Sequence, residues 1–294
     1  MSANTLPKED DGITPVPDIS SVTPPPTLEP ALAKEWVFPS WCRSGLIMLG
    51  SLLLGLIVWH IASAQGWSGF VNFTNVPTPL EVFASLQDNL ADPEFYIHLS
   101  VSIQRVMLSF LLAVLLGVPT GLFMARNKFA RAFLLPYIEI FRPIPAVAWI
   151  PLAILMWPTE ESSIIFITYL GAFFPIVLNT ISGAEQTPEV LIRATRSLGA
   201  SKFDEFRHVV FPAALPSISA GLAVGMGVAW FSLLAGEIIS GQYGIGYFTW
   251  DAYSMVRTPD IVLGMLFIGF LGTLSTFGVR LLTKPMLRWQ QRTR

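Results

Sequence analysis

The sequence predicts an all-α membrane protein with six transmembrane helices, on three observations. Only 38 of its 294 residues are charged, or 13%, against about 25% in soluble domains. The charges are clustered, and six runs carry none: residues 44–80, 106–125, 143–159, 162–184, 208–236 and 261–279. A hydrocarbon core of about 30 Å takes about 20 helical residues to cross. Six runs of this order exclude an ordinary soluble protein.

The apolar runs place the spans at about 44–64, 101–124, 133–157, 162–182, 213–238 and 260–282. In the third span, Glu139 and Arg142 are three residues apart and can pair along one helical face. Pro143, Pro145 and Pro151 follow at once, so we expect this helix to be kinked or broken.

The fifth span has small residues at helical spacing, which permits close helix contact within the bundle or in a dimer. These residues are Gly221, Gly225 and Ala229, with Gly227 between them. Three glycines that follow the span, Gly241, Gly244 and Gly246, predict a tight turn on the outer side. This turn is either part of an outer gate or simply a sharp loop.

The orientation follows from Lys and Arg, which cytoplasmic connections retain. Fifteen of the 18 lie on one side, in the segment up to Arg43, in 125–132, in 183–212 and from Arg280 onwards. The alternate connections hold one, Arg257. We therefore expect a multi-pass protein with an even number of spans and both termini in the cytoplasm.

Two segments lie outside the spans on this interpretation. Residues 1–40 carry eight prolines and six acidic groups, which predicts a disordered cytoplasmic tail ahead of a six-helix transmembrane domain at 41–294. The tail lacks the early apolar core of a secretory signal. Residues 79–90 have helical apolar spacing on the outer side, typical of a short interfacial helix. That helix is either a lid on the spans or a docking surface.

Composition also excludes several kinds of site. Cys42 is the single cysteine and the three histidines are far apart, so no disulfide or metal site is expected. There is no phosphate-binding loop of the GxxxxGK[ST] type, and no cofactor is expected in this chain. A net charge of −2 argues against a nucleic-acid partner.

The cytoplasmic loop 183–212 predicts two short amphipathic helices. Thr187 is expected to cap the first, with Pro188 at its first position, and Gly199 to end it in a left-handed conformation. Ser201 is expected to cap the second, and Pro212 to break the chain before the fifth span. The pair is either a docking knob or two helices on the membrane surface.

This loop also carries a resemblance. It reads Arg193-Ala194-Thr195, three residues, Gly199, nine residues, then Val209-Val210-Phe211-Pro212. It is similar to the loop signature of binding-protein-dependent ABC importer permeases: Glu-Ala-Ala, three residues, Gly, nine residues, Ile-x-Leu-Pro. The spacing is the same, with substitutions at Arg193, Thr195, Val209 and Phe211. Segments 138–155 and 244–253 resemble the nitrate, bicarbonate, sulfonate and taurine branch, and the similarity covers about 45–285.

The resemblance implies a bacterial inner-membrane permease for a small anion, with a type I importer fold and no catalytic residues. Its partners would be two ATPase subunits that bind ATP and Mg, a second permease copy or close relative, and a periplasmic or lipid-anchored solute-binding protein. The helix around 189–199 would seat in a groove of the ATPase. The implied coupling residues are Val190, Leu191, Arg193, Ala194, Thr195, Leu198, Gly199, Ser201, Val209 and Pro212.

Ionisable groups inside spans are costly and suggest function. The candidates for the translocation pathway are Arg105, Glu139, Arg142, Trp149, Trp230 and Glu237. Arg105 or Arg142 would lower the barrier for an anion, and the two tryptophans would narrow the path. Alternatively, the two arginines pair with Glu139 and Glu237 to fix the helix register. A protein of another class, a secondary transporter or channel with Glu139, Arg142 and Glu237 as a relay, is the alternative function; a membrane enzyme is a third.

Overall fold

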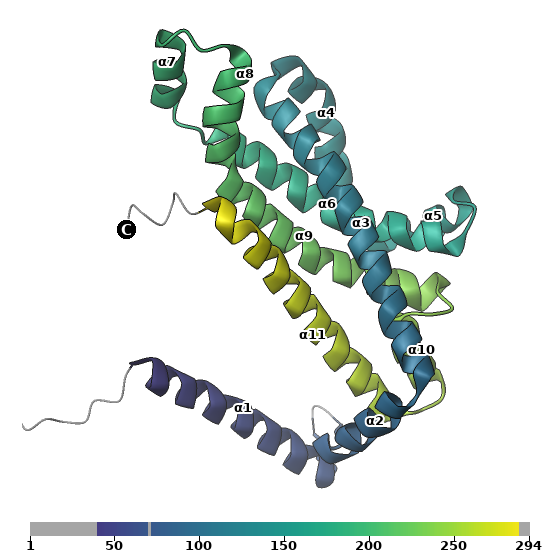
Figure 1. Ribbon diagram of the computed structural model, residues 1–294. Coiled ribbons are helices and arrows are strands. Elements are labelled where there is room, and N and C mark those ends of the chain that lie inside the picture. Colours follow the sequence, from purple (N-terminus) through teal and green to yellow (C-terminus); the bar gives the residue numbers. More distant parts are fainter. Residues whose placement is uncertain (1–39, 70–71, 288–294) are drawn as a thin grey trace, which may run out of the picture. The chain divides into compact units, whose positions relative to one another are not determined.

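The computed structural model describes residues 40–69 and 72–287, and the predicted tail, up to residue 39, lies outside them. The described residues form helices joined by short connections (Figure 1). The elements are α1 (Ser40–Ala64), α2 (Pro79–Ala91), α3 (Pro93–Arg126), α4 (Lys128–Phe141), η2 (Ala146–Trp149), α5 (Ile150–Met156), α6 (Glu160–Glu185), α7 (Glu189–Ser197), α8 (Lys202–Glu205), η3 (Phe206–Val210), α9 (Phe211–Ser240), α10 (Ile245–Ser254), α11 (Thr258–Thr283) and η4 (Lys284–Leu287).

The chain divides into two compact units, residues 1–53 and 54–294, with the boundary inside α1. The described part of the first unit is the beginning of α1, where apolar side chains such as Leu46 and Leu49 are exposed. In the second unit, the end of α1 is held by Trp59, whose Nε1 donates to the Pro77 carbonyl over 3.0 Å.

Within the described ranges, five helices are long and apolar enough to cross a membrane: Gly45–Ala64, Pro93–Arg126, Glu160–Glu185, Lys202–Ile239 and Thr258–Leu287. A sixth crossing is available if Lys128–Phe141 and Ala146–Met156, bent by 91°, count as one broken span. The bend lies at Pro143 and Pro145, because neither residue has a backbone N–H with which to continue the helix. The predicted break in the third span is confirmed.

The core of the second unit is formed by α3, α6 and α9, which pack along one another. Its largest cluster includes Val106, Ile176, Met226 and Trp230. Small residues let the backbones approach: a Cβ atom on Gly221 would lie 2.6 Å from the Cβ of Asn179 on α6. Gly221 and Gly225 therefore serve a contact within the bundle, one of the two alternatives expected, whereas Gly227 faces open space.

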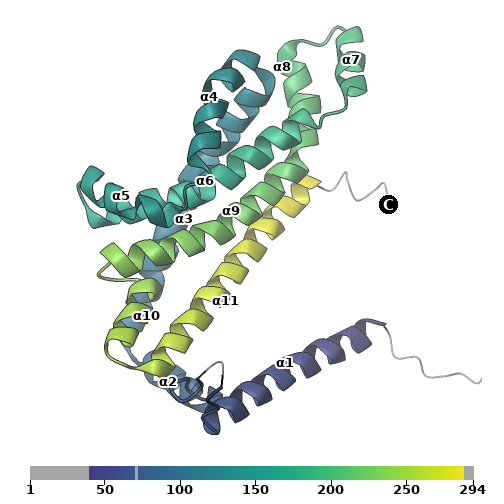
Figure 2. The ribbon, with the colours of Figure 1, turned by 180° about the vertical axis from the view of Figure 1, so that it is seen from behind.

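The two ends of the second unit differ. Helices α7 and α8 lie at one end, beside the start of α4, whereas α2 and α10 lie at the other (Figures 1 and 2). These are called the α7 end and the α10 end below. At the α10 end, α2 is the short helix predicted at 79–90: it buries Val82 and Ser85 and leaves Leu80 and Phe83 exposed. Ser85 donates to Asp260 of α11 over 2.5 Å, which fixes α2 to the bundle.

Candidate functional site

Helix α7 has a strongly amphipathic sequence, yet its apolar side chains are uncovered. Val190, Leu191 and Leu198 are 75%, 50% and 88% exposed. Ala194 and Gly199 are also exposed, and Thr195 is half-buried with its hydroxyl donating to the Leu191 carbonyl over 2.7 Å. A stripe of this kind costs solvation free energy unless another surface covers it.

The ends of α7 and α8 correct and confirm parts of the sequence prediction. Thr187 does not cap α7: its hydroxyl donates to the Ala184 carbonyl of α6, and the extended Pro188 precedes the first helical residue. Gly199 ends α7 with a φ of 79°, and Ser201 caps α8 in a capping box with Asp204, both as expected.

Pro212 does not break the chain, contrary to the prediction. Helices α8 and α9 form one continuous rod through η3, a π-helical turn in which the Phe211 amide donates to the Phe206 carbonyl five residues earlier. Proline removes a hydrogen-bond donor and crowds the preceding turn. The wider π turn accommodates both effects without ending the helix, and Val209 is half-buried within it.

A buried carboxylate holds α7 and α8 to the bundle. Glu205, at the end of α8, is 1% exposed and accepts from Arg196 of α7, with Nε 2.8 Å from Oε2. It also pairs with Arg126, the last residue of α3. The bond to Glu205 raises the pKa of Arg196. One carboxylate therefore links three elements, and no local pattern indicated this, because its partner Arg126 is 79 residues away in the chain.

At the α10 end, Arg105 and Glu237 form an ion pair, in agreement with the alternative that the arginines pair with glutamates inside the spans. The Arg105 Nη1 lies 3.0 Å from Glu237 Oε1, and both residues are buried. Arg105 also binds Glu161 of α6 with Nε 2.9 Å from Oε2, and its Nη1 donates to the Tyr243 carbonyl. Ser102 donates to Glu237 over 2.8 Å. Arg105 is thus bound on several sides.

The glycine turn after α9 wraps the Glu237 carboxylate, which accepts from the Gly246 amide over 2.9 Å. Gly244 has a φ of 125°, and a Cβ atom there would overlap the carboxyl group of Glu237. The Gly244 amide donates to Nδ1 of His98 over 3.1 Å. The predicted tight turn is confirmed, and its shape requires glycine.

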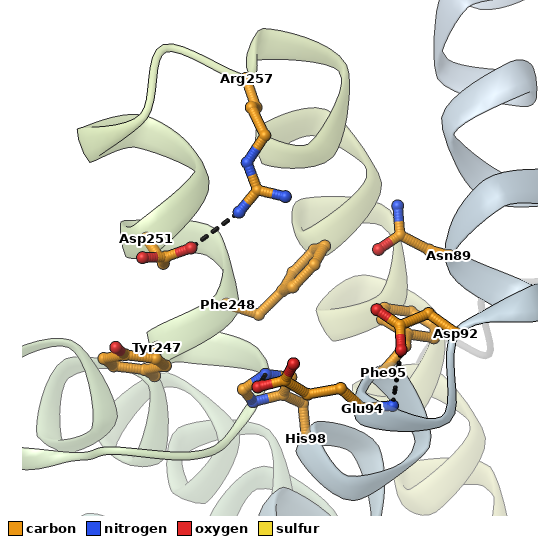
Figure 3. A pocket seen from close by; sticks show the side chains of 9 residues that line it. All are labelled: Asn89, Asp92, Glu94, Phe95, His98, Tyr247, Phe248, Asp251 and Arg257. Carbon is orange, nitrogen blue, oxygen red and sulfur yellow. Dashed lines mark hydrogen bonds and ion pairs between the residues drawn. The ribbon is translucent and has the colours of Figure 1, made fainter.

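Next to this turn is a polar pocket of about 200 Å³ between α3 and α10 (Figure 3). Three carboxylates line it, those of Asp92, Glu94 and Asp251, and Arg257 binds Asp251 over 2.7 Å. Tyr247 lies across from His98. The pocket carries a net negative charge and opens at the α10 end.

The bend of the third span borders a second cavity, of about 320 Å³. Its walls are largely apolar, with Phe174 and Phe231 among them, and Arg142 lies on its lining. Arg142 pairs with Glu139 over 2.8 Å, as expected from their spacing. Two polar atoms of its lining residues, Trp149 Nε1 and Ser232 Oγ, are buried without a hydrogen-bond partner in the described part of the chain.

The predicted pathway residues therefore fall into three places. Arg105 and Glu237 lie in the ion cluster at the α10 end, and Glu139, Arg142 and Trp149 lie at the bend. Trp230 is 5% exposed in the helix core and donates to Ser275 of α11 over 2.8 Å. Ser232 was missed because a serine in an apolar span carries no signal until its neighbours are known.

A bundle of long apolar helices with an exposed amphipathic helix at one end indicates a multi-pass membrane protein. A family model described as "Binding-protein-dependent transport system inner membrane component" matches residues 117–288. The chain belongs to this family, as the loop signature predicted, and is the permease component of an ABC importer. ATP hydrolysis in such importers is carried out by separate ATPase subunits.

Relatives extend the similarity over most of the chain. The taurine transport system permease protein TauC of Escherichia coli (strain K12) is 32% identical over 261 residues, covering 87% of this chain and 93% of the relative. The nitrate import permease protein NrtB of Synechocystis sp. is 33% identical, covering 74% and 81%. The bicarbonate transport system permease protein CmpB of Synechococcus elongatus is 32% identical, covering 83% and 90%.

Among solved structures, an inward-facing methionine ABC transporter, MetNI, matches with a TM-score of 0.49 and 21% identity, covering 64% of this chain and 98% of the matched chain. The helices and the family together confirm the predicted all-α permease fold.

Proposed function

We propose that this permease imports a small oxyanion or sulfonate, in an assembly with a second permease copy, two ATPase subunits and a solute-binding protein. The α7 end faces the cytoplasm, together with both termini. The main support is the exposed apolar face of α7, because Val190, Leu191 and Leu198 can bind in a groove of an ATPase subunit. Importers of this design leave most substrate selection to the binding protein.

Force from the ATPase reaches the membrane through the root of α7. Arg196 of α7 and Arg126 of α3 bind the same carboxylate, that of Glu205, so a displacement of α7 pulls on the end of α3. Helix α8 continues into α9, which gives a second rigid connection. Helix α7, which includes Arg193, Ala194 and Thr195, thus acts as the coupling helix. The loop that carries it is also shaped by Ser201, Val209 and Pro212.

A substitution at Gly199 tests the coupling role. Gly199→Val places a β-branched residue at a φ of 79° and fills open space beside α7. In the reconstituted importer we expect uptake to fall at least about tenfold while ATP hydrolysis continues, since 1.4 kcal/mol of lost contact corresponds to a factor of ten. Gly227→Val, also in open space but on α9, is the matched control. Full uptake with full binding-protein-stimulated ATP hydrolysis in Gly199→Val contradicts the assignment.

The cavity at the bend supports a sulfonate as the substrate within this class. Its walls are mostly apolar, and its donors, Trp149, Ser232 and Arg142, belong to one lining. A sulfonate has an anionic head for the donors and an organic part for the walls, whereas nitrate and bicarbonate have no apolar part. Arg105 and Glu237 instead stabilise the α10 end of the path.

Removal of each free donor tests the cavity. Trp149→Phe and Ser232→Ala delete an N–H and an O–H that have no hydrogen-bond partner among the described residues, so stability should hold. Hydrogen bonds to charged groups contribute about 1.5–3 kcal/mol; we expect uptake of an alkanesulfonate to fall at least about tenfold in each variant. Trp230→Phe, which loses the bond to Ser275 instead, is the control. Unchanged uptake in both donor variants would remove the cavity from the pathway.

Reconstitution of the chain alone separates the importer from a secondary transporter. We expect no uptake under a proton gradient without ATPase subunits and binding protein. Gradient-driven uptake by the chain alone would overturn the proposed assembly and favour a relay through Glu139, Arg142 and Glu237.

A further inference from the structure

A groove along α3, separate from the cavity at the bend, runs from the α7 end towards the middle of the bundle. It consists of two neighbouring cavities of about 840 and 290 Å³ that share Val118, Pro119 and Phe211 as lining residues. The larger cavity lies between α3 and the α8–η3 segment, and the smaller between α3, α9 and α11. Both lie within the second unit of the chain.

The two halves of the groove differ in charge. The half at the α7 end is lined by three cations, Arg126, Lys202 and Arg207. Arg126 is paired with Glu205, but Lys202 and Arg207 are exposed and form no ion pair with any described residue. The other half is lined by residues such as Val114, Leu115 and Leu222 and has almost no polar surface.

The length of the groove matches one leaflet of a bilayer. Val114 and Arg126 are twelve residues apart on α3, or about 18 Å at 1.5 Å per residue. Half of a hydrocarbon core is about 15 Å. The groove is therefore about as long as one leaflet is thick, with its cations at the end nearer α7. Two exposed rings, Phe123 and Phe203, border the cationic half.

We propose that this groove binds one anionic phospholipid from the leaflet at the α7 end. Its phosphate lies between Lys202 and Arg207, and an acyl chain follows α3 past Val118 to Leu115. Basic pockets between helices at the cytoplasmic membrane surface recognise such headgroups. An apolar helix would offer no anion to either cation, and a soluble anion would leave the apolar half empty. The lipid contacts the segment that roots α7.

Native mass spectrometry of the full-length chain in detergent tests the site, with phosphatidylglycerol and phosphatidylcholine of identical acyl chains as probes. We expect phosphatidylglycerol to bind more tightly, and Lys202→Gln/Arg207→Gln to weaken its binding about 30-fold, because each basic residue near a headgroup contributes about a fivefold preference. The control Lys128→Gln/Arg131→Gln removes two cations from the start of α4, outside the groove, and should leave binding unchanged.

A second pair of variants tests the apolar half. Leu115 is an exposed residue of α3 that lines the groove, so Leu115→Trp fills the groove with an indole ring. Leu111→Trp adds the same ring one turn away on α3, outside the lining. Leu115→Trp should weaken phosphatidylglycerol binding at least fivefold and Leu111→Trp should not. Equal binding of the two lipids, retention by the double variant, or equal competition by glycerol phosphate would overturn the proposal. Tight binding that appears only after deletion of the acidic residues 1–39 would identify that segment as the occupant and overturn it too.

Discussion

Glu205 and Glu237 are each 1% exposed, and they lie at opposite ends of the helical bundle. Glu205 accepts only from side chains, those of Arg126 and Arg196, which come from α3 and α7. Glu237 accepts from Arg105 and Ser102 and from a backbone amide of the glycine turn. The Glu205 carboxylate joins side chains of separate helices, whereas the Glu237 carboxylate is enclosed by the glycine turn that follows its own helix.

The charge balance of the two clusters differs as well. Two arginines share Glu205, which leaves a positive excess at the α7 end. Two glutamates, Glu161 and Glu237, share Arg105, which leaves a negative excess at the α10 end. A buried carboxylate can thus fix a turn, where it binds backbone amides, or transmit a displacement, where it binds side chains of separate helices.

Among substitutions in the two clusters, Glu237→Ala is expected to lower the stability most. It leaves buried Arg105 with Glu161 as its one carboxylate partner among the described residues, and it removes the acceptor of Ser102 and of the Gly246 amide. Loss of one partner of a buried pair costs about 3–5 kcal/mol, so the midpoint of thermal unfolding in detergent should fall sharply. Glu139→Ala, which breaks the exposed pair with Arg142, should cost about 1 kcal/mol or less. Equal midpoints for the two variants would contradict the enclosed role of Glu237.

A smaller effect is expected from alanine at the two glycines with positive φ. Gly244→Ala meets both backbone strain and the Glu237 carboxyl group, for a cost of about 3 kcal/mol. Gly199→Ala meets open space and should cost only the strain, about 1–2 kcal/mol. Unfolding midpoints of the two variants measure the difference, and a larger loss for Gly199→Ala would refute the assigned geometry.

The smallest effect on stability is expected from Glu205→Gln, because its arginine partners are partly exposed. The cost should be about 1 kcal/mol. Uptake per ATP hydrolysed should nevertheless fall, since α7 loses its charged link to α3. Glu185→Gln, which weakens the surface pair with Arg131 at the same end, is the control. A normal ratio of uptake to hydrolysis in Glu205→Gln would show that α8 and α9 alone carry the coupling.

Local chemistry made much of this structure predictable. Charge-free runs located the spans, Pro143 and Pro145 the bend, and Gly199 and Ser201 the boundary between α7 and α8. Local patterns failed where tertiary partners compete: Thr187 bonds back to α6 instead of capping α7. The burial of Glu205 was unpredictable for the same reason, because Arg126 is 79 residues away in the sequence.

The π turn of η3 has a further consequence for the rod formed by α8 and α9. A π turn holds one more residue than an α-helical turn, so residues before it are rotated relative to those after it. A single helical wheel drawn for residues 202–240 is therefore correct on only one side of the π turn, and it assigns residues on the other side of that turn to the wrong face. Deletion of a single residue between 206 and 210 would rotate Glu205 by about 100° while every side chain of the cluster remained in the sequence.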